Sequence, residues 1–403
     1  MRYFRLNVGL LFLCAAHTAL AVQGNLLSSS GFVASTVGGA TVAQFTNEFD
    51  AAIDNPALME YTKTQPGTHK FSLGLEYAYS PSSFAIDFGA THNPYVNSKL
   101  KAIWVPFLGY FYNISERFKF GTGIFVVGGA GTDFSGTIYK VKGTYSAISV
   151  PLALSYKLSE KINLGASLDI VVTRLTSNNS GIKNATSNAA TAAASLGATF
   201  EGPKSIVLGL DYVGGTTATF KKLYYPVSAN QSKDMKIGTP AQYSIGIGQN
   251  TSDYSWGLKY RYITWKDTAN YRELDWVNQS TYSLGGQYKL MDKFTGRAGI
   301  YYVTSVYGET KNVNGDQSFS YQGSPITNFL RDSGNAMQFG TAQWQYGLGA
   351  GYQIGQKSNL DFGLVYEPET TIHFKGTTKL TGPYDIRKKD SVLYAFVAYS
   401  QEV

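Results

Sequence analysis

Few side chains in this 403-residue chain have the chemistry of a catalytic site. The lone cysteine is Cys14, and beyond residue 21 the histidines are His69, His92 and His373. Nucleophilic catalysis needs a nucleophile and a base held together by a third group, and no nucleophile motif surrounds His69 or His92. A disulfide framework and a cysteine-rich zinc site are also excluded. We therefore predict that the protein is not an enzyme and that it needs no cofactor or metal.

The first 21 residues have the layout of a secretory signal peptide. Two basic residues, Arg2 and Arg5, precede the apolar run 8–16, and a small-residue site follows at Ala19-Leu20-Ala21. The run is too short to cross a bilayer as a helix. We expect export of residues 22–403, with lipid attachment through Cys14 as the alternative.

The composition narrows the classes of protein to which the chain can belong. Charged residues make up 15% of the chain, against about 25% in soluble domains, while aromatic residues make up 14%. The net charge of +7 is spread along the chain and forms no dense basic cluster, so we do not expect a nucleic-acid partner. An exported chain with no cysteine beyond residue 21 must be held by hydrogen bonds and packing instead of disulfides.

Beyond residue 66 the sequence alternates between apolar and small or polar residues, which is typical of strands with two different faces. In 256–262, for example, Trp256 and Leu258 share one face, whereas Lys259 and Arg261 share the other. A soluble β-sandwich alternates in the same way. Strands of about 10–15 residues with aromatic residues at their ends favour a membrane-spanning barrel instead.

The spacing of the turns gives the number of strands. Short polar turns recur near residues 115, 160, 202, 251, 291 and 356, and longer polar connections such as 176–195, 216–239 and 307–342 lie between them. Short turns at one end and long loops at the other are typical of outer-membrane barrels. Twelve strands flank the turns, and strands near 69–79 and 391–400 bring the total to fourteen. We therefore predict an all-β, transmembrane antiparallel β-barrel of about 14 strands over residues 67–403, located in the outer membrane of a Gram-negative bacterium.

Residues 22–66 have a different character, because they are rich in small residues and do not alternate. Phe32, Phe45 and Phe49 argue against a disordered leader, and a separate domain of this size is too small to be stable without a metal or disulfide. A barrel of 14 strands is too wide to be filled by its own side chains. We predict that this segment is a hatch that plugs the lumen, with a turn at Asn55-Pro56.

Several short motifs resemble those of one family of outer-membrane proteins. Ser28–Gly31, Gly38–Ala40 and above all Asn55-Pro56-Ala57-Leu58 resemble the N-terminal hatch of FadL-type transporters, which are channels for long-chain fatty acids with relatives that import aromatic hydrocarbons. The resemblance continues along the chain in Trp104-Val-Pro106, Phe118-x-Phe-Gly121, Thr239-Pro-Ala-Gln-Tyr243, Gly296-Arg297 and Asp361-x-Gly363.

This resemblance implies passive uptake of hydrophobic compounds, most of all long-chain fatty acids. The ligand would pass through an apolar pocket and leave sideways through the barrel wall, and each buried CH₂ of an acyl chain contributes about 0.8 kcal/mol. The candidate path residues are the hatch aromatics and the turn that follows them: Phe32, Phe45, Phe49, Asn55, Pro56 and Ala57. The alternative is that these residues only pack the plug and form its turn.

The resemblance also implies a cation for the fatty-acid carboxylate. The candidates are Arg174, Lys259, Arg261 and Arg297. The last three alternate onto the lumen side, whereas Arg174 has the parity of the lipid-facing side and reaches a ligand only above the bilayer or after a bulge. For each of the lumen cations, the alternative is a structural ion pair with Asp50, Asp54, Asp169 or Asp361.

Two other functions stay open at this point. An aromatic-hydrocarbon importer would share the fold, and a general diffusion porin would share the barrel. A porin needs a constriction lined by opposing rows of charge, whereas the inward positions here are mostly Gly, Ser and Thr. The expected surroundings are outer-membrane lipid and lipopolysaccharide, and a plugged barrel would be a monomer.

Overall fold

The computed structural model describes residues 26–137, 142–178, 185–224, 233–307, 312–338, 340 and 342–403. The predicted signal peptide lies outside the described residues. No helix in the described part of the chain has the length and apolar character needed to cross a membrane.

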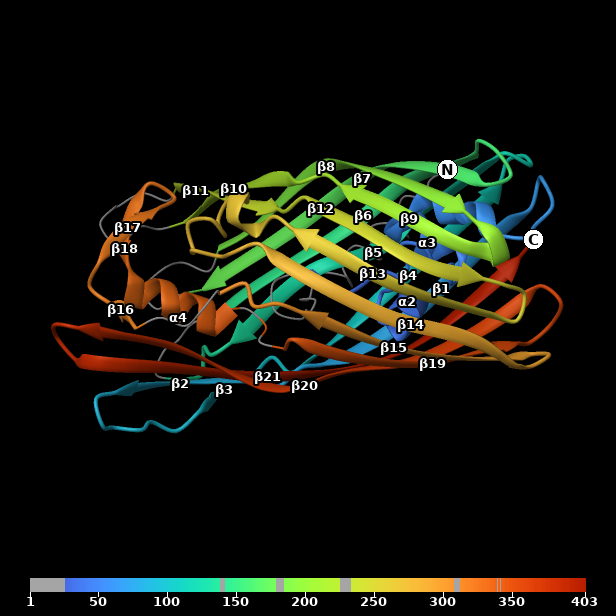
Figure 1. Ribbon diagram of the computed structural model, residues 1–403. Coiled ribbons are helices and arrows are strands. Elements are labelled where there is room, and N and C mark those ends of the chain that lie inside the picture. The colour runs from blue at the N-terminus through green and yellow to red at the C-terminus, as the bar shows by residue number, and fades with distance from the viewer. Residues whose placement is uncertain are drawn as a thin grey trace, which may run out of the picture.

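Fourteen long strands form one antiparallel sheet that closes on itself (Figure 1). The last strand pairs with the first over ten residue pairs, from Lys70 with Glu402 to Tyr79 with Leu393. Closure leaves no free sheet edge at this seam, as a wall in lipid requires. The predicted closed barrel of 14 strands is confirmed. Its strands are β1 (His69–Tyr79), β4 (Ala102–Asn113), β5 (Phe118–Asp133), β6 (Lys142–Lys157), β7 (Ile162–Asn178), β8 (Ala185–Glu201), β9 (Ile206–Val213), β12 (Gln242–Asn250), β13 (Tyr254–Ile263), β14 (Gln279–Met291), β15 (Phe294–Val303), β19 (Trp344–Gln353), β20 (Ser358–Thr378) and β21 (Gly382–Glu402).

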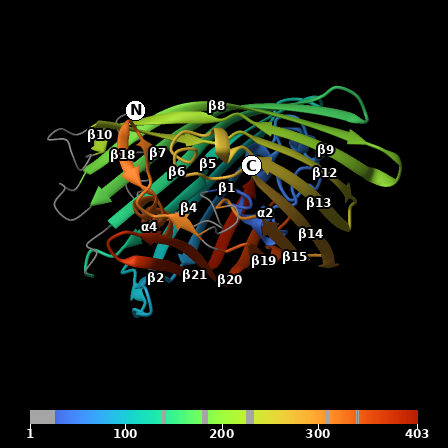
Figure 2. The same cartoon turned by 60° about the vertical axis from the view of Figure 1, so that its left-hand side comes forward.

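The two ends of the barrel differ as the turn spacing predicts. All six short turns connect neighbouring barrel strands at one end, which we call the short-turn end. The connections at the other end, the long-loop end, carry further elements, and Figure 2 shows β10, β18 and α4 together there. These elements are β2 (Ser82–Phe88), β3 (Val96–Asn97), β10 (Thr216–Tyr224), β11 (Lys233–Thr239), β16 (Val313–Asn314), β17 (Ser318–Tyr321), β18 (Ser324–Thr327) and α4 (Asn328–Gln338), with a single 3-10 turn at Trp265–Asp267. Another single 3-10 turn, at Pro203–Ser205, belongs to the short turn between β8 and β9.

The outer face of the barrel carries the apolar half of each alternating pattern. Leu168 on β7, Leu258 on β13 and Leu348 on β19 are all exposed, at 49%, 48% and 62%. A continuous apolar surface of this kind is the face that lipid covers. On β13 the inward residues are Lys259 and Arg261, as the alternation predicts, and both are buried.

Residues 26–66 lie inside the barrel at the short-turn end (Figure 1). This segment, the hatch, contains α2 (Phe32–Thr36), α3 (Glu48–Asp54) and the 3-10 helix η1 (Pro56–Tyr61). Asn47 caps α3, since its side-chain oxygen accepts a hydrogen bond from the Asp50 amide. Near the end of the hatch, the Lys119 ammonium of β5 lies 3.0 Å from a carboxylate oxygen of Glu60, and both side chains are buried.

Inward glycines make room for the backbone of the hatch. A Cβ atom at Gly209 would lie 2.0 Å from the Val42 carbonyl oxygen, and one at Gly285 would lie 2.1 Å from the Val37 carbonyl oxygen. Contacts this short are closer than real Cβ atoms approach. The small inward residues of the wall therefore fit a lumen filled by the hatch, which contrasts with the charged constriction of a diffusion porin.

Candidate functional site

The barrel wall is interrupted between β4 and β5. Strand β4 pairs with β1 along its whole length, but it pairs with β5 only from Leu108 to Asn113. Over residues 125–133, β6 is the only barrel strand that pairs with β5 in the described structure. Residues 102–107 and 125–133, all of which the structure describes, therefore have no ladder between them. In a lipid-embedded wall such a stretch is unusual, because its backbone groups lack partners on the neighbouring strand.

Local sequence explains why the two strands separate. Pro106 has no N–H to donate to a neighbouring strand, and proline in sheets is confined to edges and bulges. On β5 the pairing with β6 shifts register between Val126 and Gly128, which marks a bulge. Beyond the bulge the separated strands are joined again, because the Lys99 amide donates to the Asp133 carbonyl oxygen at 2.7 Å. The interruption is thus bounded at both ends.

A small cavity of about 30 Å³ lies on the inner side of the interruption. Polar side chains also line it, but we call it the apolar cavity because the wall beside the interruption contributes only apolar side chains to it. Ile103 and Val105 of β4, Val126 of β5 and hatch residues from Leu27 onwards line it. A cavity of this size holds one or two waters, so a larger ligand requires the hatch to move. Leu26 forms an isolated antiparallel bridge with Gly128, which places the start of the described hatch against the unpaired edge of β5.

Two of the three predicted path aromatics lie at the foot of this interruption. The Phe32 ring centroid is 5.0 Å from that of Phe107 and 5.3 Å from that of Phe396. Phe49 meets Phe107 edge-on at 6.4 Å, and Phe107 meets Phe125 at 5.3 Å. The structure thus brings Phe32 and Phe49 together. Phe45, whose ring lies 6.5 Å from that of Tyr61, packs against the same cluster.

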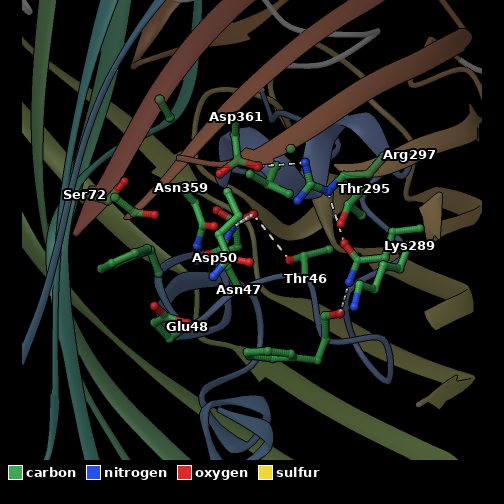
Figure 3. Close-up of a pocket in the computed structure, with 18 of the residues that line it drawn as sticks. Thr46, Asn47, Glu48, Asp50, Ser72, Lys289, Thr295, Arg297, Asn359 and Asp361 are labelled. Carbon is green, nitrogen blue, oxygen red and sulfur yellow. Dashed lines mark hydrogen bonds and ion pairs between the residues drawn. The ribbon is translucent and has the colours of Figure 1, made fainter. Parts of the chain in front are cut away.

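A larger cavity of about 380 Å³ lies on the other side of Phe32, at the short-turn end (Figure 3). Its lining is polar and includes Asp50 of the hatch. Arg297 also lines it, but one guanidinium nitrogen lies 2.8 Å from the Asp361 carboxylate and another donates to Gln287. The alternative predicted for Arg297, a structural ion pair with Asp361, is the arrangement found here.

Lys259 and Arg261 line a third cavity, of about 80 Å³. Arg261 donates hydrogen bonds to Gln242, to the Leu27 carbonyl oxygen and to the Tyr301 hydroxyl. No carboxylate of the described residues lies within 4.0 Å of the Lys259 ammonium.

Three aspartates share this cavity with the two cations. Asp54 accepts hydrogen bonds from Ser29 and Thr41, and Asp169 accepts them from Ser167 and Ser195. Hydroxyl groups therefore hold two of the carboxylates, and the Lys259 ammonium is left facing the cavity. The third, Asp211, keeps one buried oxygen without a partner.

Arg174 is not brought together with these cations. It lies on β7 opposite Ser146 of β6 and Asn188 of β8, and neither pairing contains a bulge at this point. Its side chain therefore stays on the face of Leu168 and Ile170, the outer face of the barrel. The bulge that would turn it into the lumen is absent from the described part of β7.

The Asn55-Pro56-Ala57 turn anchors the hatch to the wall. The Asn55 side-chain oxygen accepts from the Ala57 amide at 3.1 Å, and its amide group donates to the Val42 carbonyl oxygen at 2.7 Å. The same amide group lies 3.4 Å from the Leu210 carbonyl oxygen of β9. Pro56 begins η1, where its missing N–H costs nothing. These contacts give the turn a structural role and place no part of it in the apolar cavity.

Asp50 makes the stability of the hatch depend on pH. Its buried carboxylate accepts from the Ala34 amide at 2.6 Å, and burial, with the neighbouring Asp54, raises its pKa to about 8. Asp361 raises this pKa further, whereas the Ala34 amide and Arg297 lower it. Because the folded pKa exceeds the ordinary aspartate value of 3.8, the folded hatch binds the extra proton between about pH 4 and pH 8.

We therefore expect the hatch to lose stability as pH rises from about 4 to about 8, with little further change above pH 8. Each pKa unit corresponds to about 1.4 kcal/mol, so the total effect amounts to a few kcal/mol. Hydrogen-exchange protection factors of residues 32–54, measured across this range, test the expectation. The Asp50→Asn variant should remove the pH dependence, and a wild-type hatch whose protection rises with pH would contradict it.

The interruption and the residues that line it are not among the sites predicted from the sequence. The available signal was Pro106, which stands inside an otherwise regular strand pattern and lies in the part of β4 that does not pair with β5. Glu76, an inward carboxylate on β1 that lines the apolar cavity, was also missed. Its parity with the inward residue Ala78 could have identified it.

Comparison with known proteins adds family and fold. A model of the family of outer membrane protein transport proteins (OMPP1/FadL/TodX) matches residues 10–263. Outer membrane protein P1 of Haemophilus influenzae is 24% identical over 446 aligned positions, which cover 92% of this chain and 90% of that protein.

Two solved structures share the architecture. A FadL homologue from Pseudomonas aeruginosa superposes with a TM-score of 0.69 at 17% identity, over 94% of this chain and 99% of its own. The toluene transporter TodX of Pseudomonas putida superposes with a TM-score of 0.66 at 17% identity, over 93% of this chain and 99% of its own. At this level of identity the structural likeness supports the fold.

Proposed function

Since the chain belongs to the FadL/TodX family of outer-membrane transport proteins, we propose that it takes up long-chain fatty acids through a lateral opening between β4 and β5. Transport would be passive. The ligand would enter from the long-loop end, pass the hatch and leave into the membrane through the barrel wall. The hatch occupies the lumen without help from a second chain, so we propose that the protein acts as a monomer.

The observation that carries this proposal is the interrupted ladder with an apolar cavity behind it. Residues 102–107 of β4 and 125–133 of β5 have no ladder between them, and Ile103, Val105 and Val126 form the apolar lining at that level. A hydrophobic ligand gains free energy by staying out of water along the whole route. A lateral exit would keep the ligand out of water, because it leads from an apolar cavity directly into lipid.

The cavity with Lys259 supports a fatty acid as the ligand. It shares Leu27, Ser29 and Ser30 of the hatch with the apolar cavity, so the two adjoin. A carboxylate beside the Lys259 ammonium would form the close ion pair that no carboxylate of the described residues forms. An acyl chain could then extend past the shared hatch residues towards the interruption.

An aromatic hydrocarbon is the second candidate ligand. One of the solved structures similar to this chain is that of a toluene transporter. Phe32, Phe107 and Phe125 offer ring faces and edges at the foot of the interruption. Such a ligand needs no cation, so its uptake would not depend on Lys259.

Uptake of labelled oleate and toluene, with sugar leakage followed in parallel, tests the proposal in cells that lack their own importers. We expect the wild-type protein to increase oleate uptake, and the Lys259→Met variant to lower the ratio of oleate to toluene uptake by about tenfold, as loss of a charged hydrogen bond predicts. The control is Lys221→Met, which changes an exposed lysine of β10. Toluene uptake alone would favour the second candidate, and a gain for sugars alone would contradict both.

A further inference from the structure

Four inward side chains form a polar cluster beside the apolar cavity. They lie on adjacent strands, namely Glu76 on β1, Gln345 on β19, Glu367 on β20 and Tyr394 on β21. Glu76, Gln345 and Tyr394 line the cavity directly. Glu76 is paired in register with Val105 of β4, so it lies one strand away from the unpaired edge.

The cluster has more hydrogen-bond acceptors than donors. One oxygen of Glu367 accepts from the Gln345 amide at 2.9 Å and from the Tyr394 hydroxyl at 3.3 Å. The other Glu367 oxygen and the Gln345 carbonyl oxygen are buried without a partner in the described structure. Glu367 is 0% exposed and Gln345 is 3% exposed, so bulk water does not supply the missing donors. Glu76 is only half-buried, and it too has no hydrogen bond or ion pair among the described residues.

Nearby cations do not balance these carboxylates. Lys388, further along β21, is buried and is held by Asp390 at 3.7 Å and by the Ser82 hydroxyl. In the described part of the chain, no lysine, arginine or histidine nitrogen lies within 4.0 Å of Glu76 or Glu367. Buried acceptors without donors cost free energy, and a group that donates to them recovers it.

We propose that Glu76, Gln345, Glu367 and Tyr394 form a subsite that binds a hydrogen-bond-donating head group, an amine or a hydroxyl, on a hydrophobic permeant beside the lateral opening. This inference rests on the proposed lateral route. The cluster complements an N–H or O–H group and repels an ionised carboxylate. A permeant with such a head group is therefore held at the exit, whereas a fatty-acid anion passes it with its carboxylate kept near Lys259.

The test compares three probes with the same chain length: dodecan-1-ol, dodecylamine and dodecane. Cells that lack their own importers produce the full chain, and uptake of each labelled probe is measured. We expect the Glu76→Leu variant to lower the alcohol-to-alkane and amine-to-alkane uptake ratios by about tenfold, as loss of a hydrogen bond predicts. The amine ratio should fall further than the alcohol ratio if the ionic charge of Glu76 contributes to binding.

A nearby carboxylate provides the matched control. Glu369→Gln changes an exposed carboxylate two residues from Glu367 and should leave both ratios unchanged. Should Glu76→Leu fail to reach the membrane folded, Glu76→Gln replaces it. That variant keeps the size of the side chain and one acceptor oxygen but exchanges the other oxygen for an N–H donor. A smaller fall in both ratios is therefore expected.

The possible results distinguish failure of the subsite from failure of the proposed function. Unchanged uptake ratios in both Glu76→Gln and Gln345→Leu would overturn the subsite. So would a fall by the same factor in the uptake of all three probes. Uptake of the hydrophobic probes by the wild-type protein would still support the lateral route in either case. No uptake of any probe or of oleate by the wild-type protein would instead contradict the proposed function itself.

Discussion

A bulky thiol reagent attached to the Val126→Cys variant is expected to lower uptake of the hydrophobic ligand by about tenfold or more, since overpacking a filled site costs ~1–3 kcal/mol. Val126 lies on β5 at the bulge and lines the apolar cavity behind the interruption. The cavity measures only about 30 Å³, so a reagent anchored there leaves no room for a permeant. Before labelling, the variant should transport normally, because the cysteine side chain is unbranched and similar in volume to that of valine.

The chain suits this experiment because its lone cysteine is Cys14, within the predicted signal peptide. The introduced thiol is then the only target of the reagent in the exported protein. The matched control is Leu168→Cys on β7, where the side chain is 49% exposed on the outer face of the barrel. Labelling there should leave uptake unchanged. Equal uptake by labelled and unlabelled Val126→Cys protein would mean that the ligand leaves by another route.

The parts of the fold that depend on one strand at a time could be predicted from the sequence. Alternation is a property of a single strand, so it placed Lys259 and Arg261 inside the barrel. Short polar turns are also local, and all six were found where they were expected. The last strand is longer than the predicted 391–400, because 382–390 continue the hairpin with β20 towards the long-loop end.

The interruption could not be predicted in the same way, because it depends on pairing between strands. Pro106 signals only that one N–H is missing, and many prolines sit in edge strands without opening a wall. The separation also needs the bulge at Val126 and Gly128, which is defined only by the register with β6. The absence of a bulge near Arg174 also depends on pairing between strands, since only the pairings of β7 with β6 and β8 reveal it.

The candidate site was predictable in its parts but not in its arrangement. The Asn55-Pro56 pair predicts a turn from local chemistry alone. Its partners, Val42 and Leu210, are 13 and 155 residues away from Asn55 in the chain. For Arg297 the sequence allowed either a ligand or a structural ion pair, and only the distance to Asp361 favours the second.

Deleting residues 22–48 is expected to leave a barrel that assembles but conducts small solutes or loses selective uptake. Closure depends on β1 and β21, which pair over ten residue pairs outside the deleted segment. The remaining part of the hatch would keep its anchors, namely the Asn55 contact with β9 and the ion pair between Glu60 and Lys119. Planar-bilayer conductance, sugar leakage and uptake of labelled oleate measure the outcome.

The reason to expect leakage is the set of glycines that faces the deleted backbone. Gly285 approaches the Val37 carbonyl oxygen and Gly209 approaches the Val42 carbonyl oxygen, and neither strand has a side chain there to fill the space that the hatch vacates. A barrel of 14 strands is too wide to close over such positions. Removing the β17–β18 hairpin, residues 318–327, is the matched control, since it shortens the long-loop end and leaves the hatch in place. Unchanged conductance together with unchanged uptake after deletion of 22–48 would contradict the role of the hatch as a plug.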